Sequence, residues 1–363
     1  MSELRACIEA AESLRAERAA CFIATVVDVQ GSSYRKCGAR MVFSEERWLA
    51  GSVSGGCLER DVLAKGAYRT RHGRAHLTTY DALTEERSGT GCDGVIHVLV
   101  ERSAINPEQL TDPLNFAARC LRFETRGVFV TVFRSRCADV PVGAHHAELV
   151  GGERQTELPG WLCERLHGTF ARALHEPVPR AHCVAVDGVQ MLVEHVAPPI
   201  HLFVFGGAHD AVPLVTFGRA LGWSVSVCEP HAQLSSRERF RTADQHRIGP
   251  LTEAIAALQA CARPAAVVMN HHYERDLAAV EALLKTSCPY VGLLGARTRS
   301  ARIRSDLTDR GVQVDERLHA PVGLPIGAES PQEIALAIVA EIQSELCDRA
   351  RTSNHAVRLV TTA

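Results

Sequence analysis

The feature that most constrains the fold of this 363-residue chain is the alternation of short apolar runs with helical patterns that follows Pro198 and Pro199. HLFVF, SVSVC, AAVVM and YVGLL each have the length of a buried strand, and helical stretches of about 10 residues separate them. Strands that alternate with helices in this way form a parallel sheet with helices on both faces. The sequence therefore predicts a Rossmann-like, doubly wound domain over residues 199–350, followed by a tail over 351–363.

The residues before this boundary predict a different architecture. Short β-rich runs separated by glycine turns occupy residues 21–101, and a helical pattern follows Gly56. GVFVTVFRSRCADVPVGAH can be aligned with CFIATVVDVQGSSYRKCGAR, which suggests an internal duplication, although chance similarity explains the match equally well. We expect a mixed α+β domain over 1–198, which a duplication would divide into 1–105 and 106–198. The whole chain is thus predicted to be of the α/β class.

Composition excludes several classes of function. Apolar residues make up 46% and charged residues 23%, as in soluble globular proteins, and a net charge of -2 would not attract nucleic acid or anionic membranes. No apolar run approaches the roughly 20 residues that a membrane-spanning helix needs, and the N-terminus does not resemble a signal peptide. The 13 cysteines never form C-x-x-C, which favours free thiols in a reducing cytoplasm and argues against a zinc site.

Two glycine-rich segments of the N-terminal half each contain a cysteine. GSVSGGCLE leads into a predicted helix, whose first N–H groups can hold an anion and whose dipole favours a thiolate at Cys57. GTGCDG places Cys92 in a loop that a ligand can approach closely. Thiolates bind soft metals and carry sulfur, so these two segments are candidates for such chemistry. Glycine turns with small buried cysteines would explain both segments without any ligand.

A third segment, GSSYRKCGAR, places cationic side chains on a turn between two strands. Arg35 and Arg40 are candidates for binding a phosphate or another anionic group. A solvated turn explains the same residues.

Polar residues also follow the strands of the C-terminal half, at the edge where open α/β sheets bind their ligands. A dinucleotide fingerprint aligns with Gly206, Ala208 and Ala211, so its middle glycine is missing. Glu229 ends the second strand, where an acid binds ribose hydroxyls. Loop residues that only cap helices would give the same pattern. The candidates for this crevice are Gly206, Gly207, His209, Glu229, His271, Gly295 and Arg297.

These segments, in this order, resemble the XdhC/CoxI family of xanthine dehydrogenase accessory proteins. The N-terminal resemblance lies in GSSYRKCGARMVF, GSVSGGCLE and GTGCDGVIHVLVE. The C-terminal resemblance lies in FGGAHDAVPL, NHHYERD, YVGLLGAR and LHAPVGLPIGAESPQEIALAIVAEI. The chain departs from the family where Cys37 replaces a commoner proline, where Asp93 stands for glycine or asparagine, and where Gly207-Ala208 reverses the usual order. The last departure argues against nucleotide binding.

The resemblance implies a cytoplasmic, non-enzymatic chaperone of the molybdenum cofactor. Such a factor protects the cofactor, promotes its sulfuration by a cysteine desulfurase and delivers it to an apo xanthine dehydrogenase-type hydroxylase; a homodimer is expected. By position in the family's segments, Cys57 and Cys92 would contact the cofactor and act as ligands of its molybdenum or sulfur. The cofactor-binding residues expected from the resemblance and the local patterns are Cys57, Cys92, Ser54, Gly55, Gly56, Arg35 and Arg40.

Two other functions remain open from the sequence. The Rossmann-like half would suit an NAD(P)-dependent oxidoreductase, although a fold alone does not define a function. A scaffold that docks a desulfurase to its client, without binding any cofactor, would need neither cysteine.

Overall fold

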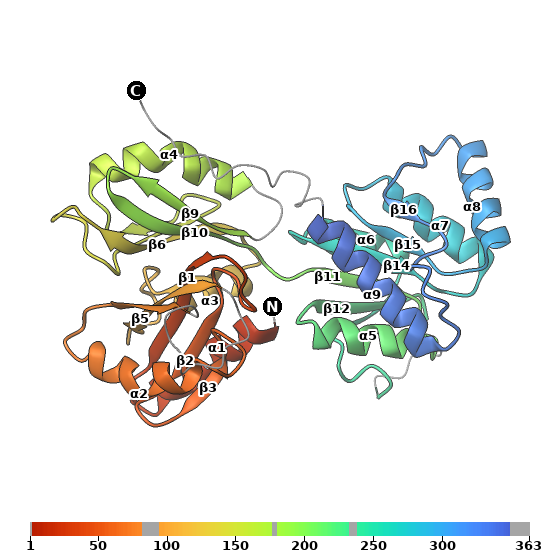
Figure 1. Cartoon of the computed structure of the whole chain (residues 1–363). Helices are drawn as coiled ribbons and strands as arrows, with labels where there is room; N and C mark the ends of the chain where they lie inside the picture. The colour runs from red at the N-terminus through yellow and green to blue at the C-terminus, as the bar shows by residue number, and fades with distance from the viewer. Residues whose placement is uncertain (1, 82–93, 176–179, 232–237, 349–363) are drawn as a thin grey trace. The chain divides into compact units, whose positions relative to one another are not determined.

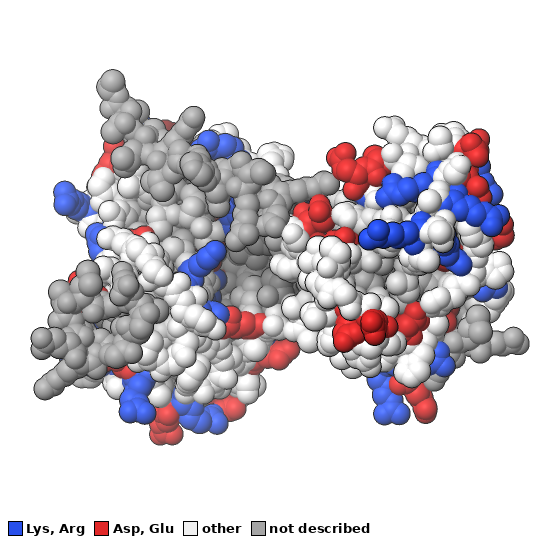
Figure 2. All heavy atoms as spheres, turned by 45° about the vertical axis from the view of Figure 1, so that its right-hand side comes forward, with Lys and Arg blue, Asp and Glu red and all other residues white. Residues whose placement is uncertain are grey.

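The computed structural model describes residues 2–81, 94–175, 180–231 and 238–348 (Figure 1). These residues group into two compact units that meet in the sequence at Pro198 and Pro199. No helix in the described part of the chain is long and apolar enough to cross a membrane. On the face shown in Figure 2, both units carry acidic and basic side chains, so neither sign of charge dominates that face.

The C-terminal unit is built on a six-stranded sheet in which every pairing is parallel. Its strands are β11 (His201–Phe205), β12 (Ser224–Glu229), β13 (Gln245–Ile248), β14 (Pro264–Val268), β15 (Val291–Leu293) and β16 (Leu318–His319). The spatial order β13-β12-β11-β14-β15-β16 is that of dinucleotide-binding folds, with the topological switch point between β11 and β14. The predicted Rossmann-like sheet is confirmed, although the sequence pattern missed β13 and β16.

Helices cover both faces of this sheet, as Figure 1 shows. On one face, α5 (Ala211–Ala220) and α9 (Pro331–Asp348) pack over an apolar core. On the other lie α6 (Leu251–Gln259), α7 (Tyr273–Leu284) and α8 (Arg297–Asp309). The predicted capping box is present before α9: the Ser330 N–H donates to the Glu333 carboxylate at 2.8 Å, and the Glu333 N–H donates to Ser330 Oγ at 3.3 Å.

The N-terminal unit contains one arrangement twice: a helix, three strands, a helix and two strands. The first copy comprises α1 (Ser2–Ala16), β1 (Phe22–Gln30), β2 (Arg40–Phe43), β3 (Trp48–Gly51), α2 (Glu59–Arg69), β4 (His76–Asp81) and β5 (Val95–Arg102). The second comprises α3 (Pro113–Arg122), β6 (Gly127–Ser135), β7 (His145–Leu149), β8 (Arg154–Thr156), α4 (Gly160–His175), β9 (Arg180–Val186) and β10 (Val189–Val196). The antiparallel sheets have matching orders, β3-β2-β1-β5-β4 and β8-β7-β6-β10-β9. The faint sequence repeat therefore corresponds to a duplicated topology.

The two copies also match in strand register. Thr25 of β1 pairs with Arg40 of β2, and Thr131 of β6 pairs with His145 of β7. The register between β1 and β5 shifts after Val26, and that between β6 and β10 shifts at the corresponding place. Each shift marks a β-bulge, which bends the strand and increases its twist.

The two sheets contact each other through the bulged residues. Val27 and Phe133, which correspond in the duplication, are buried together with the corresponding pair Leu99 and Leu192. The opposite faces of the sheets are covered by α2 in the first copy and by α4 in the second. Burial of these four apolar side chains stabilises the contact between the copies by the hydrophobic effect.

Two buried ion pairs link the same sheets. Arg40 of β2 pairs with Glu194 of β10 at 2.5 Å, and His145 of β7 pairs with Glu101 of β5 at 2.7 Å. Arg40 corresponds to His145, and Glu101 corresponds to Glu194, because each occupies the same register position in its own copy. The acidic residue of each copy thus pairs with the basic residue of the other, as two-fold symmetry between the copies requires.

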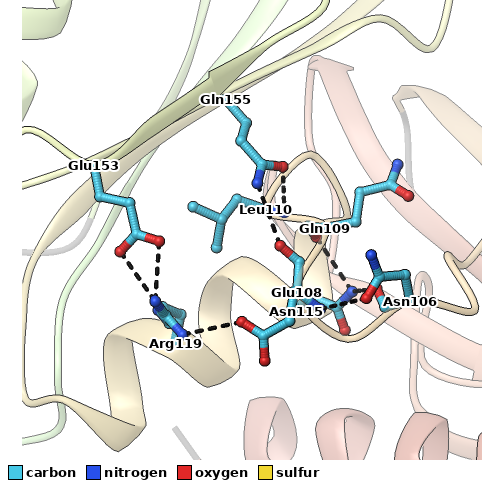
Figure 3. A network of polar contacts seen from close by, with 8 residues as sticks. All are labelled: Asn106, Glu108, Gln109, Leu110, Asn115, Arg119, Glu153 and Gln155. Carbon is cyan, nitrogen blue, oxygen red and sulfur yellow. Dashed lines mark hydrogen bonds and ion pairs between the residues drawn. The ribbon is translucent and has the colours of Figure 1, made fainter.

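Polar contacts fix the connection between the copies against the second copy (Figure 3). The Leu110 N–H donates to Gln155 Oε1 at 2.8 Å. Arg119 of α3 donates to Glu108 at 3.3 Å and to Glu153 at 2.9 Å. The connection is therefore anchored along its length to α3 and to the turn and strand that follow β7.

Candidate functional site

The loop 51–58, between β3 and α2, is folded around one carboxylate. Glu59, the first residue of α2, accepts the backbone N–H groups of Val53 at 2.9 Å, Ser54 at 2.8 Å and Gly56 at 2.9 Å. It also accepts the hydroxyl of Ser54 at 2.6 Å. The side chain that follows the glycines therefore fills the cradle that those backbone amides form.

These contacts determine the charge state of Glu59. Burial alone would raise the pKa of its carboxyl, but the Ser54 hydroxyl and the loop N–H groups outweigh burial and lower the pKa to about 2. Since the amides already have an internal anionic partner, they do not form an open anion site. Ser54, Gly55 and Gly56, predicted as cofactor contacts, instead shape the loop: both glycines have φ values in the left-handed region, 112° and 126°.

Cys57 is the thiol that this loop presents. It follows the two left-handed glycines, and it is exposed to solvent. Val53 and Leu58, which flank the turn, are buried in the core of the first copy and anchor its ends. The loop thus holds a thiol at the surface on a backbone that is fixed by internal hydrogen bonds.

The turn 31–37, between β1 and β2, lies against this loop. The ring of Tyr34 covers Gly55 so closely that a Cβ at Gly55 would lie 3.0 Å from Tyr34 Cδ1. Tyr34 is nonetheless 75% exposed. Gly94 packs on the backbone of the same turn, where a Cβ would lie 2.4 Å from the Ser32 carbonyl oxygen. Cys92 lies outside the described residues.

Tyr34 was not among the residues predicted from the sequence, where the cations of its turn were selected instead. The available signal was an aromatic residue between polar residues in a glycine turn. Core packing does not explain an aromatic side chain at such a position. Its exposed ring lies beside the loop that carries Cys57 and offers a flat apolar surface there.

The two predicted cations of the turn have different surroundings. Arg35 is partly exposed and pairs with Glu3 of α1 at 2.5 Å. Arg40 is buried, and its guanidinium binds both carboxylate oxygens of Glu194, at 3.0 and 2.5 Å. The prediction that Arg40 contacts an anionic ligand is therefore corrected: it is the first residue of β2, and its side chain points between the two sheets. Lys36 is the exposed cation of this turn.

In the C-terminal unit, the loops that follow β11 and β14 meet at the topological switch point. His271 Nε2 lies 2.6 Å from Asp210 Oδ2, so a hydrogen bond bridges the two loops. Gly206 has a φ of 127°, and a Cβ there would lie 2.4 Å from the Met269 carbonyl oxygen. The first glycine of the fingerprint is thus required for the close approach of the loops.

Glu229 lies at the end of β12, as predicted for an acid that binds ribose. Its buried carboxylate is 2.8 Å from His246 Nε2. It also lies against Gly207, since a Cβ there would be 1.9 Å from Glu229 Oε1. Glycine is needed at this position because the carboxylate occupies the space of a side chain.

A cavity of about 430 Å³ opens at the carboxyl ends of the strands, on the face covered by α6 and α7. Its walls are mainly apolar, with Pro230, Ile248 and Leu251, and its polar groups include Glu229 and Arg275. Of the predicted crevice residues, Glu229 lines this cavity, whereas those absent from its lining are Gly206, Gly207, His209, His271, Gly295 and Arg297. Both His209 and Arg297 are exposed.

Fold and site define a two-domain protein: a duplicated antiparallel domain presents a cysteine loop, and a Rossmann-like domain has a pocket at its strand ends. The family model described as the XdhC Rossmann domain matches residues 202–342, and that of the XdhC and CoxI family matches residues 14–81. The chain belongs to the XdhC and CoxI family, which confirms the resemblance seen in its sequence motifs.

Individual relatives agree with this assignment. The chain is 30% identical over 324 residues to a probable xanthine dehydrogenase subunit of Bacillus subtilis (strain 168), covering 88% of this chain and 91% of the relative. It is 29% identical over 182 residues to the uncharacterized protein YqeB of Escherichia coli (strain K12), 48% of this chain and 32% of that protein. A solved structure described as a xanthine dehydrogenase from Bacillus halodurans superimposes with a TM-score of 0.77 at 26% identity, covering 98% of both chains.

Proposed function

We propose that this protein is a xanthine dehydrogenase accessory factor that handles the molybdenum cofactor as cargo. It binds the cofactor at the Cys57 loop, supports its sulfuration by a cysteine desulfurase and passes it to an apo hydroxylase. Family membership and the name of the Bacillus subtilis relative support the link to xanthine dehydrogenase. In this proposal the chain is not itself an enzyme.

The exposed thiol of Cys57 carries the proposal. Its loop amides are already bound to Glu59, so the loop offers a thiol rather than an anion site. A thiolate is a soft donor that suits molybdenum and sulfur chemistry, whereas an amide cradle would suit a phosphate. The fixed backbone keeps Cys57 at the surface, where a bulky cargo and a partner protein can both reach it.

The neighbouring side chains fit the other parts of such a cargo. The ring of Tyr34, 75% exposed beside Gly55, provides a surface on which a flat pterin can stack. The exposed ammonium of Lys36, on the same turn, suits the cofactor's phosphate. In this arrangement Cys57 holds the metal end, and the turn 31–37 holds the organic part.

The test is direct binding. Purified protein is incubated anaerobically with molybdenum cofactor, free cofactor is removed, and bound molybdenum and pterin are quantified. Wild type should retain both near stoichiometrically, Cys57→Ala and Cys57→Ala/Cys92→Ala should lose them, and Tyr34→Ala should retain less pterin. Cys163→Ala, a partly exposed cysteine of the second copy, is the matched control. Retention by the double variant would favour a scaffold, and no binding by folded wild type would refute the proposal.

A second candidate, an NAD(P)-dependent activity, is favoured by one observation in the C-terminal unit. Its strand order matches dinucleotide-binding folds, and the cavity at its strand ends contains Glu229 at the ribose-binding position. Ala208, in place of the second fingerprint glycine, opposes it. Calorimetric titration with NAD(H) and NADP(H) tests this candidate. Micromolar binding that Glu229→Gln weakens would support it, and the absence of binding would refute it.

A further inference from the structure

Three possible metal ligands, two from the first copy and one from the second, meet at one side of the contact between the two sheets. Asp28 lies on β1, Cys37 precedes β2, and Cys183 lies on β9 of the second copy. Their donor atoms all lie within 4.8 Å of one another, and Cys183 Sγ is 3.5 Å from Asp28 Oδ1. All three residues are partly exposed, so an ion can reach them from solvent.

These separations suit a tetrahedral zinc ion. Zinc binds thiolate sulfur at about 2.3 Å and carboxylate oxygen at about 2.0–2.2 Å. With tetrahedral angles, these bond lengths place sulfur and oxygen about 3.5–3.7 Å apart and two sulfurs about 3.8 Å apart. The 3.5 Å between Cys183 Sγ and Asp28 Oδ1 therefore already matches the separation in a zinc-loaded site.

The duplication provides an internal comparison for the two cysteines. Cys37 corresponds to Val142, because each directly precedes a glycine whose N–H donates a hydrogen bond to the central strand of its own copy. Gly38 donates to the Val26 carbonyl of β1, and Gly143 donates to the Val132 carbonyl of β6. Cys183 corresponds to Leu77, because their strand partners Leu192 and Leu99 correspond. All four side chains pack on the apolar cluster of Val27 and its neighbours. Val142 and Leu77 thus fill one side of the contact with apolar side chains. Packing alone therefore does not require the thiols of Cys37 and Cys183 on the other side.

The carboxylate is also confined to this side. Asp28 corresponds to Arg134 of β6, which cannot bind a cation. Next to Asp28, His97 Nε2 lies 3.8 Å from Oδ2, and its other ring nitrogen is 2.9 Å from Thr79 Oγ1. The carboxylate also accepts a hydrogen bond from Gln30 Nε2 at 3.3 Å, and a neighbour of this kind can orient a metal ligand.

We propose that Asp28, Cys37 and Cys183 bind a zinc ion, with solvent at the fourth position. As each sulfur–zinc bond forms, its thiol releases one proton, so the two thiols release two protons per ion, and Asp28 supplies a carboxylate oxygen. The ligands come from both copies, so the ion clamps the two sheets together and stabilises the N-terminal unit. Spacing rules based on C-x-x-C do not detect this site, because its two cysteines are separated by more than a hundred residues.

The test uses Co²⁺ as a spectroscopic probe of full-length, reduced, metal-free protein. Every sample carries Cys57→Ala, so that the surface thiol does not contribute and the result is independent of the proposed cofactor binding. One equivalent of Co²⁺ should produce a sulfur-to-cobalt charge-transfer band and tetrahedral d–d bands. Zn²⁺ should abolish them by competition and raise Tm.

Cys37→Val/Cys183→Leu is the decisive variant, because it replaces each cysteine by the apolar residue at the corresponding position of the other copy, Val142 or Leu77. It should fold with its packing intact, bind Co²⁺ at least about tenfold more weakly, and show no rise in Tm with Zn²⁺. Cys163→Ala should behave as the parent. The proposal is overturned if the folded parent gives no charge-transfer band, if the variant binds equally well, or if thiol counting shows a Cys37–Cys183 disulfide in anaerobically isolated protein.

Discussion

Glu59→Gln tests whether the Cys57 loop is held by an internal carboxylate. Glutamine keeps one carbonyl oxygen, which can still accept the N–H groups of Val53 and Ser54. Its amide nitrogen cannot accept the N–H of Gly56, which Glu59 accepts at 2.9 Å. The substitution therefore preserves the size of the side chain. It removes the negative charge and the oxygen that accepts the N–H of Gly56.

The magnitude follows from the same contacts. The pKa of Glu59 falls from 4.5 to about 2 on folding, a lowering of about 2.5 that corresponds to at most about 3 kcal/mol. Charge-assisted hydrogen bonds contribute about 1.5–3 kcal/mol each, which gives a similar range for the bonds that are lost. We expect the variant to destabilise the closed loop by about 2–3 kcal/mol at pH 7.

Hydrogen exchange of the peptide that covers residues 51–58 is the assay. A loss of 2–3 kcal/mol should accelerate exchange of the protected loop amides about 30- to 150-fold. The pH dependence supplies a second readout. Because the folded-state pKa is lowered, the stabilisation is fully present above pH 4.5 and is lost as the pH falls towards 2, so the variant and wild type should converge there.

Glu45→Gln, on the exposed turn between β2 and β3, is the control and should leave exchange unchanged. If Glu59→Gln exchanges within about threefold of wild type at pH 7, the carboxylate does not hold the loop, and the account of Cys57 presentation is refuted.

Three further outcomes follow from the contact between the copies. Arg40→Leu leaves Glu194 buried without its partner and should lower the free energy of unfolding in urea by about 3–5 kcal/mol; a loss below about 1 kcal/mol would contradict the pairing. Burial lowers the pKa of His145, but Glu101 outweighs burial and raises it. The resulting stabilisation is present below about pH 6.5 and declines as the pH rises through the folded-state pKa, so the urea midpoint should fall over that range, and Glu101→Gln should flatten the decline. Gly143→Ala puts a methyl group 2.5 Å from another side chain's Cβ at a φ of +87°, and calorimetry should show a loss of about 1–3 kcal/mol; an unchanged Tm would contradict this geometry.

The sequence predicted the architecture of the C-terminal unit because each of its central strands is a short, mainly apolar run, and helical patterns separate these runs. β13 and β16 were missed because QHRI and the two-residue β16 carry no such run. Hydrophobic pattern identifies strands that are buried on both faces, and edge strands lack that signal.

The candidate site was predicted less completely, for reasons of tertiary contact. Cys57 was selected as a candidate because a glycine-rich segment precedes a helix, which is a local pattern; its role as a ligand stays a prediction. Arg40 was misplaced because its partner, Glu194, lies more than 150 residues away on another sheet. The role of Glu59 was missed because its spacing from Ser54 is not that of a capping box. Local patterns predict backbone shape well, but a side chain's partner depends on the folded neighbours.

The reciprocal pairing of Arg40 with Glu194 and of His145 with Glu101 has a consequence for how the N-terminal unit varies between proteins. In a symmetric homodimer each mutation appears twice and must be tolerated in both protomers. Here the two halves are encoded separately, so one half can change while the other stays constant. That freedom is visible in the loop 51–58, whose counterpart before α4 is short and carries no cysteine. A covalent pair of similar halves can thus specialise one partner for chemistry and keep the other as its support.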